Sequence, residues 1–398
     1  MGKVNAISGI SMGSAASKTR YGKRNDSLIV LVKKGNTISG KFTNNSFKSS
    51  PVLIAQEHLT AASGKTSALM INAGNANAGT GKQGARDVLE CCQSVAKELN
   101  INVKSVIPFS TGVIGEPLKT QNYIEAFIKA SRNLKPNSWL EAAKSILTTD
   151  TKPKLLSRKV LCNRKDISVS GFAKGSGMIR PDFATLLSFV FVDAKINKSL
   201  LKDIHTEALL MSFERITVDG DTSPNDSSVL IASGNLVNKI EKGTRDEKKL
   251  RAAIVEMYKE LADLLIQDAE GATKKITVNV FQARDELQAK SVAFTVAESP
   301  LVKTALFGND ANWGRILSAV GRSSEINDVS KVSIDLNGTP LAKKGNLDPS
   351  HSEKKASKAI QKKNLEINIK LGHGKSTFSV LTSDFSEDYL LINSDYRS

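Results

Sequence analysis

AKGSGMIRPDFATLLSFVFV, at residues 173–192, joins a glycine-rich loop to an apolar run that is typical of a buried strand. In the loop two glycines flank a serine, and Thr185 is the last residue before the apolar run 186–192. A hydroxyl group therefore stands at the junction of a loop and a strand. We expect residues 167–172 to form the strand that pairs with 186–192 across this loop.

A hydroxyl at such a junction suits self-cleavage. It can attack the carbonyl before it, move the acyl chain from nitrogen to oxygen and, after hydrolysis, leave Thr185 as a new N-terminus. The freed α-amine has a pKa of about 7.7 to 8.0 and can serve as general base for its own side chain. Ala184 adds little bulk before the bond. On local pattern alone, an ordinary Gly-Ser loop that leads into a core strand is the favoured alternative.

Length and composition are those of a globular protein. The 398 residues are enough for two or three domains or one large layered unit, and 40% of them are hydrophobic. Three cysteines form neither a disulfide framework nor a C-x-x-C metal motif, so a reducing compartment such as the cytoplasm is expected. Residues 1–24 hold five basic residues and no acidic one, which resembles a transit peptide and leaves the mitochondrial matrix as an alternative.

The net charge of +16 raises nucleic acid as a partner. The lysines are spread along the chain and aromatic residues make up only 5% of it, so we expect no nucleic-acid partner. Attraction for small anionic substrates explains the charge equally well. No apolar run approaches the roughly 18 residues of a membrane span, so no membrane partner is expected.

Strands and helices alternate along the chain, which favours an α/β or α+β layered fold. A hairpin through residues 34–36 is expected to join the first two strands. A turn at 110–115 is expected to follow the fourth. The expected strands are 28–32, 37–42, 67–72, 103–109, 167–172, 186–192, 216–218, 276–281, 332–336 and 365–369. The expected helices are 85–99, 121–134, 139–147, 200–213 and 246–267.

Three other patterns in the sequence do not predict a functional site. The glycines at 79, 81 and 84 have dinucleotide-loop spacing, but the acidic residue expected after the next strand is missing, so a tight turn lined by asparagines is favoured. The segment 219–225 resembles a calcium loop, but Pro224 replaces the required glycine. Four scattered histidines make a histidine-based triad or a zinc site unexpected, and we expect no metal.

Several short segments are weak signals separately but indicate a protein family when they occur together in this order. They are KFTNN (41–45), INAGNANAGTG (71–81), STGVIGEPL (110–118), TTDTKPK (148–154), AKGSGMIRPDFATLLSF (173–189), ITVDGDTSPND (216–226), EGATK (270–274), GNDANWGRI (308–316) and INSDYRS (392–398). In this combination the chain resembles the ornithine acetyltransferase family, also called glutamate N-acetyltransferase, of arginine biosynthesis. The resemblance runs over nearly the whole chain and outweighs the local pattern around Thr185.

The resemblance implies self-cleavage between Ala184 and Thr185, which gives an α chain (1–184) and a β chain (185–398) that stay associated. Thr185 would then take acetyl from N-acetylornithine, release ornithine and pass acetyl to glutamate through an acetyl-threonine ester. Thr111 and Gly112 match the oxyanion-hole pair. The positions that match substrate-binding residues, besides Thr185 itself, are Thr151, Lys174, Glu270, Asn393 and Ser398.

The resemblance also implies an α/β fold with layered sheets between helices, related to self-processing aminopeptidases, and a smaller second α/β domain. We place the main domain at 1–284 and the smaller one at 285–398, with 282–288 as the linker and the C-terminal tail returning to the active site. No cofactor is implied, although acetyl-CoA is an optional co-substrate, and two α and two β chains are expected to assemble.

A self-processed aminopeptidase or amidohydrolase on the same scaffold is the competing interpretation. In that enzyme water, rather than glutamate, would intercept the acyl group on Thr185. A nucleic-acid-binding protein is the third hypothesis, and it predicts binding that weakens steeply with salt.

Overall fold

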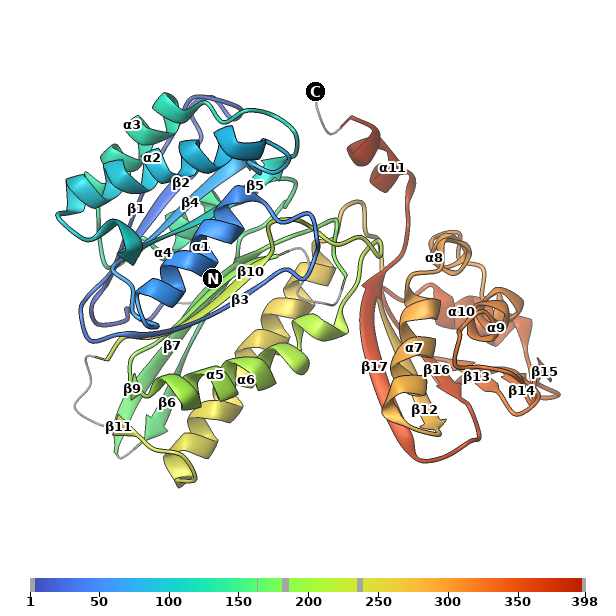
Figure 1. Ribbon diagram of the computed structural model, residues 1–398. Helices are drawn as coiled ribbons and strands as arrows, with labels where there is room; N and C mark the ends of the chain where they lie inside the picture. Colours follow the sequence, from blue (N-terminus) through green and yellow to red (C-terminus); the bar gives the residue numbers. More distant parts are fainter. Residues whose placement is uncertain (1–3, 163, 181–185, 235–238, 396–398) are drawn as a thin grey trace. The chain divides into compact units, whose positions relative to one another are not determined.

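The structure is a computed structural model that describes residues 4–162, 164–180, 186–234 and 239–395 (Figure 1). The chain divides into two compact units. Unit 1 consists of residues 1–214 and 221–265, and unit 2 consists of residues 215–220 and 266–398. Most of the second unit follows residue 265, and residues 282–288 contain the end of a strand and the start of a helix.

Unit 1 contains two large sheets and six helices among its described residues. The first sheet has the order β1-β2-β4-β5, with β1 (Ile10–Ala15), β2 (Ser27–Val32), β4 (Ala68–Asn75) and β5 (Val106–Val113). The second has the order β3-β10-β8-β7-β6, with β3 (Thr37–Phe42), β10 (Ser227–Ala232), β8 (Leu187–Val192), β7 (Lys165–Lys174) and β6 (Lys154–Cys162). Two short strands, β9 (Lys195–Ile196) and β11 (Lys239–Ile240), pair beside them. The helices are α1 (Ser50–Ala61), α2 (Gly81–Leu99), α3 (Thr120–Arg132), α4 (Trp139–Ser145), α5 (Lys198–Leu210) and α6 (Arg245–Gln267), with 3-10 turns at Val103–Ser105 and Phe213–Arg215.

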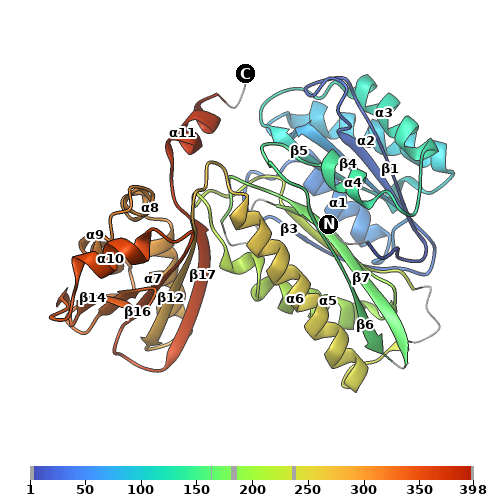
Figure 2. The same cartoon turned by 180° about the vertical axis from the view of Figure 1, so that it is seen from behind.

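The two sheets of unit 1 form the inner layers of a four-layer arrangement. Helices α2 and α3 cover the outer face of the first sheet, and α5 and α6 cover the outer face of the second (Figures 1 and 2). Aromatic side chains fill the space between the sheets, among them Trp139, Phe172 and Phe191. The expected fold class, α/β with layered sheets between helices, is confirmed.

Helix α2 shows why local patterns predict its position well. Val88, Cys92 and Val95 recur at helical spacing and are buried against the first sheet. Asn100 ends the helix in the left-handed conformation (φ 53°). At its start, the side chain of Asn77 donates to the carbonyl of Gly84, so the glycine-rich stretch is the asparagine-lined turn that the sequence favours.

Strand β8 is the centre of the second sheet. All six of its residues are buried, so its apolar run shows no alternation. It pairs antiparallel with β7, with Lys174 opposite Leu187, and parallel with β10 on its other side, with Leu187 opposite Ser227. The expected pairing of 167–172 with 186–192 across the loop is therefore confirmed.

The expected hairpin between 28–32 and 37–42 is wrong. The two segments are strands β2 and β3, but β2 pairs with β1 and β4 in one sheet and β3 pairs with β10 in the other. The side-chain amide of Asn36 donates to the carbonyls of Lys33 and Thr66, which holds the connection between the sheets. A short turn alone does not determine which partner a strand takes.

Two further local expectations are also wrong. The expected turn at 110–115 is largely strand, because the parallel pairing of β5 with β4 continues to Val113 opposite Asn75. The expected strand at 216–218 is reduced to one bridge between Ile216 and Leu381.

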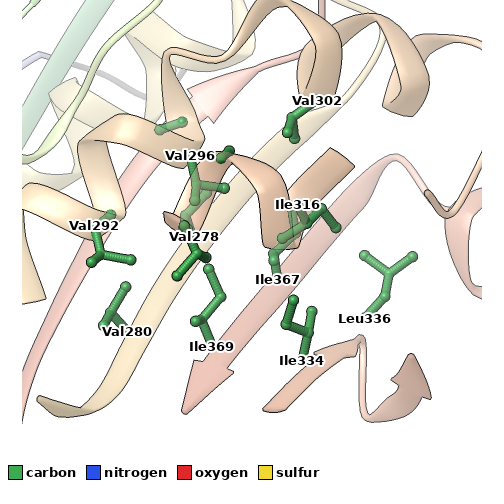
Figure 3. Packing of buried hydrophobic residues seen from close by; sticks show 14 of the residues in the cluster. Val278, Val280, Val292, Val296, Val302, Ile316, Ile334, Leu336, Ile367 and Ile369 are labelled. Atoms are coloured by element: carbon green, nitrogen blue, oxygen red, sulfur yellow. The ribbon is translucent and has the colours of Figure 1, made fainter. Parts of the chain in front are cut away.

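Unit 2 is built on one sheet with helices packed on it. The strand order is β15-β14-β13-β16-β12-β17, with β15 (Asn346–Leu347), β14 (Thr339–Lys343), β13 (Ser333–Leu336), β16 (Asn364–Lys370), β12 (Lys275–Ala283) and β17 (Ser376–Ser383). The helices are α7 (Glu286–Ala297), α8 (Pro300–Phe307), α9 (Trp313–Gly321), α10 (Glu353–Ile360) and α11 (Glu387–Ser394). Alternate residues of β12 and β16, such as Val278 and Ile367, point toward Val292 of α7 and Ile316 of α9 (Figure 3). Within the described residues, every helix is too short or too polar to cross a lipid bilayer.

His205 lies fully buried between two hydroxyl groups of unit 1. Its Nδ1 lies 2.9 Å from Ser39 Oγ and its Nε2 lies 2.9 Å from Ser228 Oγ. Burial, with a smaller effect from Lys41, lowers the pKa of the imidazole from 6.5 to about 3. The ring is therefore neutral at physiological pH.

We expect protonation of His205 to oppose folding. The unfolded chain binds the proton more tightly than the folded one, so the free energy of unfolding should fall as the pH drops from 6.5 toward about 3. In His205→Gln this loss between neutral pH and a pH of about 4.5 should be smaller by roughly 2 kcal/mol, as measured by urea unfolding. His373→Gln, at an exposed site, is the control. An acid dependence of His205→Gln equal to that of the wild type would contradict the assignment.

Candidate functional site

The candidate site of unit 1 is centred on Lys174, the last residue of β7. Lys174 is only 8% exposed, and its Nζ donates to Thr111 Oγ1 (3.1 Å) and Thr148 Oγ1 (2.9 Å). Nζ also lies 4.0 Å from a carboxylate oxygen of Asp150. The fold thus brings together two residues, Thr111 and Lys174, that the sequence analysis selected from segments far apart in the chain.

Asp150 supplies the counter-charge for this site. It accepts a hydrogen bond from the backbone amide of Gly175 (2.7 Å), and it forms an ion pair with the buried Lys154 (2.5 Å). Burial alone would raise the pKa of the Asp150 carboxyl, but Lys174 and Lys154 together hold that pKa below its usual range. The carboxylate is therefore charged at neutral pH. Sequence reasoning missed Asp150, although it lies within the TTDTKPK segment and is followed four residues later by Lys154.

Thr111 and Gly112 lie near the end of β5, beside β4. Gly112 has a φ of 131°, and a Cβ atom on it would lie 2.3 Å from the carbonyl carbon of Gly74. Only glycine fits this position without displacing β4. The side chain of Asn225 donates to the carbonyl of Ser110 (3.0 Å), so the segment before β10 is also tied to β5.

Ala184 and Thr185, the expected cleavage site and nucleophile, lie outside the described residues, as does Ser398. The carbonyl of Leu186, just before β8, accepts a hydrogen bond from the amide of Ser227 (2.9 Å). The residue after Leu186 pairs with Lys174 across the strands. Thr151 is exposed, directly after Asp150, whose side chain is buried.

Glu270 and Asn393 lie together in unit 2. The side-chain amide of Asn393, on α11, donates to Glu270 Oε2 (2.9 Å). Glu270 is 7% exposed, whereas Asn393 is exposed. Tyr389, one turn earlier on α11, approaches Asp219 with its hydroxyl group (3.3 Å). The contact between Glu270 and Asn393 joins two segments that the sequence analysis assigned to substrate binding.

One buried lysine holds the end of β17, the strand that leads to α11. Lys303 is 1% exposed, and its Nζ donates to Thr382 Oγ1 (2.8 Å) and to the carbonyl of Ser383. Burial lowers the pKa of Lys303 to about 7, although Asp384 and other acids partly oppose this. Asp384 in turn accepts hydrogen bonds from the amides of Thr273 and Lys274, each 2.9 Å long. These polar contacts connect the end of β17 with the segment that carries Glu270.

The arrangement in unit 1 suits the chemistry of a carbonyl group. A buried ammonium group stands beside the Thr111-Gly112 segment, and the start of β8 lies opposite it. Negative charge that develops on a carbonyl oxygen is stabilised strongly by donors in such a buried environment. His205 does not form a catalytic triad with its two serine partners, because all three side chains are buried on the helix side of the sheet.

These layers and this polar site belong to a known family of enzymes. The chain matches the ArgJ family over residues 11–398. It is 41% identical to the arginine biosynthesis bifunctional protein ArgJ of Psychrobacter arcticus, over 98% of this chain and 97% of that protein. It is equally 41% identical to the protein of the same name from Methylococcus capsulatus, over 98% and 96%. The chain belongs to the ArgJ family and is an enzyme of arginine biosynthesis.

Solved structures of related proteins are similar to this chain as well. The ArgJ protein of Bacillus halodurans has 34% sequence identity and a TM-score of 0.48, over 51% of this chain and 95% of that chain. Ornithine acetyltransferase of Mycobacterium tuberculosis, solved in complex with ornithine, has 28% identity and a TM-score of 0.41, over 45% of this chain and 94% of that chain.

We expect Asp150→Asn to destabilise unit 1 strongly. The change removes the counter-charge of two buried lysines, and breaking a buried ion pair in this way costs about 3–5 kcal/mol. The melting temperature should fall by about 10 °C, measured by differential scanning calorimetry. Asp166→Asn, which breaks an exposed pair with Lys159, is the matched control and should cost at most about 1 kcal/mol. Equal effects of the two changes would show that the Asp150 pair is not important for stability.

Proposed function

We propose that this enzyme transfers acetyl from N-acetylornithine to glutamate through an acetyl ester of Thr185, after self-cleavage between Ala184 and Thr185. Family membership supports the reaction, since the relatives are named for arginine biosynthesis and one solved relative was studied with ornithine. One observation carries the assignment to this site. Lys174 is paired with the start of β8 and donates to Thr111, so the segments before and after the cleavage site converge on the Thr111-Gly112 pair.

In the cleavage step, the Thr185 hydroxyl attacks the carbonyl carbon of Ala184. The C–O bond forms as the C–N bond breaks, and the nitrogen takes up a proton to become the α-amine of Thr185. Water then hydrolyses the ester, which leaves a carboxylate on Ala184 and a free hydroxyl on Thr185. The new amine can accept the hydroxyl proton in the next reaction.

In the transfer step, the Thr185 hydroxyl attacks the acetyl carbonyl of N-acetylornithine. The proton passes through the α-amine to the departing nitrogen, and ornithine leaves. The amine of glutamate then attacks the acetyl ester and restores the hydroxyl. Donors at Thr111 and Gly112 are proposed to stabilise the oxyanion in both halves of the reaction.

Substrate binding is proposed to divide between cationic and anionic groups. Lys174 suits a substrate carboxylate, and Glu270 suits the side-chain ammonium of ornithine. Asn393, which donates to Glu270, would orient that carboxylate. Thr151 and Ser398 are proposed to contribute hydroxyl groups.

We extend the proposal to acetyl-CoA as a second acetyl donor, because the relatives are named bifunctional. The proposed assembly contains two α and two β chains, and the proposed compartment is the cytoplasm.

We expect purified wild-type protein to consist of two fragments that end and begin at Ala184 and Thr185. Thr185→Ala lacks the attacking hydroxyl and should stay whole, whereas Thr60→Ala, at an exposed site on α1, should cleave normally. Intact-mass spectrometry under native and denaturing conditions measures all three. A wild-type chain that stays whole would contradict the mechanism.

With N-acetylornithine and glutamate together, we expect one N-acetylglutamate for each ornithine released. With N-acetylornithine alone, we expect a burst of one ornithine per active site, because the acetyl group then stays on Thr185. Mass spectrometry of the products and of the β chain measures both. Release of acetate without N-acetylglutamate would instead identify a self-processed amidohydrolase.

A further inference from the structure

Asp384 is a fully buried acid that the reaction scheme above does not use. It follows β17 directly and is 0% exposed. One of its carboxyl oxygens accepts hydrogen bonds from two successive backbone amides, those of Thr273 and Lys274 (2.9 Å each). The other oxygen accepts from the hydroxyl group of Thr273. A single carboxyl group therefore fixes the chain just after Glu270.

The start of α11 contacts the same segment a second time. The hydroxyl of Ser386, which precedes the helix, donates to the carbonyl of Gly271 (2.5 Å). Gly271 has a φ of 63°, and a Cβ atom on it would lie 2.5 Å from the backbone nitrogen of Tyr389, in the first turn of α11. Only glycine allows the helix to begin so close to this segment. The first turn of α11 is therefore placed against the residue that follows Glu270.

Contacts along α11 extend this placement to Glu270 itself. The side-chain amide nitrogen of Asn393 donates both to the carbonyl of Tyr389 (2.9 Å) and to Glu270 Oε2 (2.9 Å). The ring of Tyr389 stacks on that of Phe385, with the ring centres 4.5 Å apart. Within α11, which the structure describes from end to end, no residue is buried. Hydrogen bonds and this ring contact thus determine where Asn393 meets Glu270.

The direction of the Glu270 carboxyl group matters for the proposed chemistry. Under the proposed function this group pairs with the side-chain ammonium of N-acetylornithine, and such a charge-assisted hydrogen bond weakens steeply when its angle is poor. Glu270 is only 7% exposed, so water compensates poorly for a misplaced carboxyl group. The contacts that place Glu270 and Asn393 relative to each other therefore affect how well the ammonium group is bound.

We propose that Asp384 is a positioning residue that gives the enzyme its preference for an acetyl donor with a cationic side chain. It holds the segment after Glu270 against the start of α11, so that Asn393 keeps the Glu270 carboxyl group in the direction of the substrate ammonium. This inference rests on the proposed function, in which Glu270 binds that ammonium group. Because it is fully buried, Asp384 acts through the backbone of Thr273 and Lys274 rather than on the substrate.

The test compares two acetyl donors, N-acetylornithine and N-acetylnorvaline, which has the same carbon chain without the side-chain ammonium. The quantity measured is the ratio of their kcat/KM values, with glutamate as acceptor. Asp384→Ala removes the acceptor of both amides, so this ratio should fall about tenfold, which is the order of the loss from one misaligned charge-assisted hydrogen bond. The KM for N-acetylornithine should rise, whereas kcat/KM for N-acetylnorvaline and the rate of self-cleavage should stay close to the wild-type values.

Two variants separate positioning from stability. Asp384→Asn keeps an oxygen that accepts from both amides, so the donor preference should be kept, but it lacks the negative charge that partly compensates the buried Lys303 and should melt at a lower temperature. Gln288→Leu is the matched control. Gln288 is also buried in unit 2, and its side chain binds the backbone of Arg284 and Glu325. Its loss should lower the melting temperature and leave the donor preference unchanged.

Glu270→Gln tests the route of the effect. If Asp384 acts through Glu270, then Asp384→Ala should change the ratio little once Glu270→Gln is present, and the two changes should be far from additive. A tenfold effect of Asp384→Ala in both backgrounds would overturn the proposed role.

Two other results would also overturn the role of Asp384. They are a wild-type donor preference in Asp384→Ala and an Asp384→Asn variant with as low a ratio as the alanine variant. If Asp384→Ala does not fold, Asp384→Ser decides, because its hydroxyl replaces only part of the lost hydrogen bonding; a lower ratio supports the role and an unchanged ratio contradicts it. A normal ratio in Glu270→Gln contradicts the proposed function of Glu270, whereas a lowered ratio there with an unaffected Asp384→Ala contradicts only this inference.

Discussion

The buried charge of Lys174 depends on the buried carboxylate of Asp150. An ammonium group removed from water costs several kcal/mol unless an opposite charge and hydrogen bonds compensate it. Asp150 provides the charge and also binds the amide of Gly175 and the ammonium group of Lys154. One carboxylate therefore connects the end of β7, the start of β6 and the loop before β6. The position of Lys174 beside Thr111 follows from that connection.

In unit 2, hydrogen bonds to backbone groups hold two distant segments of the chain together. Asp384 accepts from two successive backbone amides, at Thr273 and Lys274, and the hydroxyl of Ser386 donates to the carbonyl of Gly271 (2.5 Å). These bonds hold the chain after β17 against the segment that contains Glu270. Helix α11 has no buried residues, so polar contacts rather than a hydrophobic core determine its place within the unit.

Asp150 and Asp226 show how one residue type acquires opposite shifts of its pKa. Both are buried, and burial raises the pKa of each carboxyl. Asp150 has two lysines in its immediate surroundings, and their attraction lowers its pKa below the usual value. Asp226 is attracted by Lys174 alone, which does not offset burial. The pKa of a buried carboxyl is thus lowered where two lysines adjoin it and raised where burial dominates.

The sequence by itself determined the elements whose patterns are local. The apolar run of β8, the helical spacing of α2 and the pairing of β7 with β8 were all predictable, because neighbours in sequence generate them. The family segments also provided the residues that we propose for the chemistry. Only the tertiary structure decided that β2 and β3 belong to different sheets, and that Asp150 pairs with the buried lysines of the candidate site. Strand partners and buried charges depend on contacts between distant segments, and their energies arise only once those segments have left water.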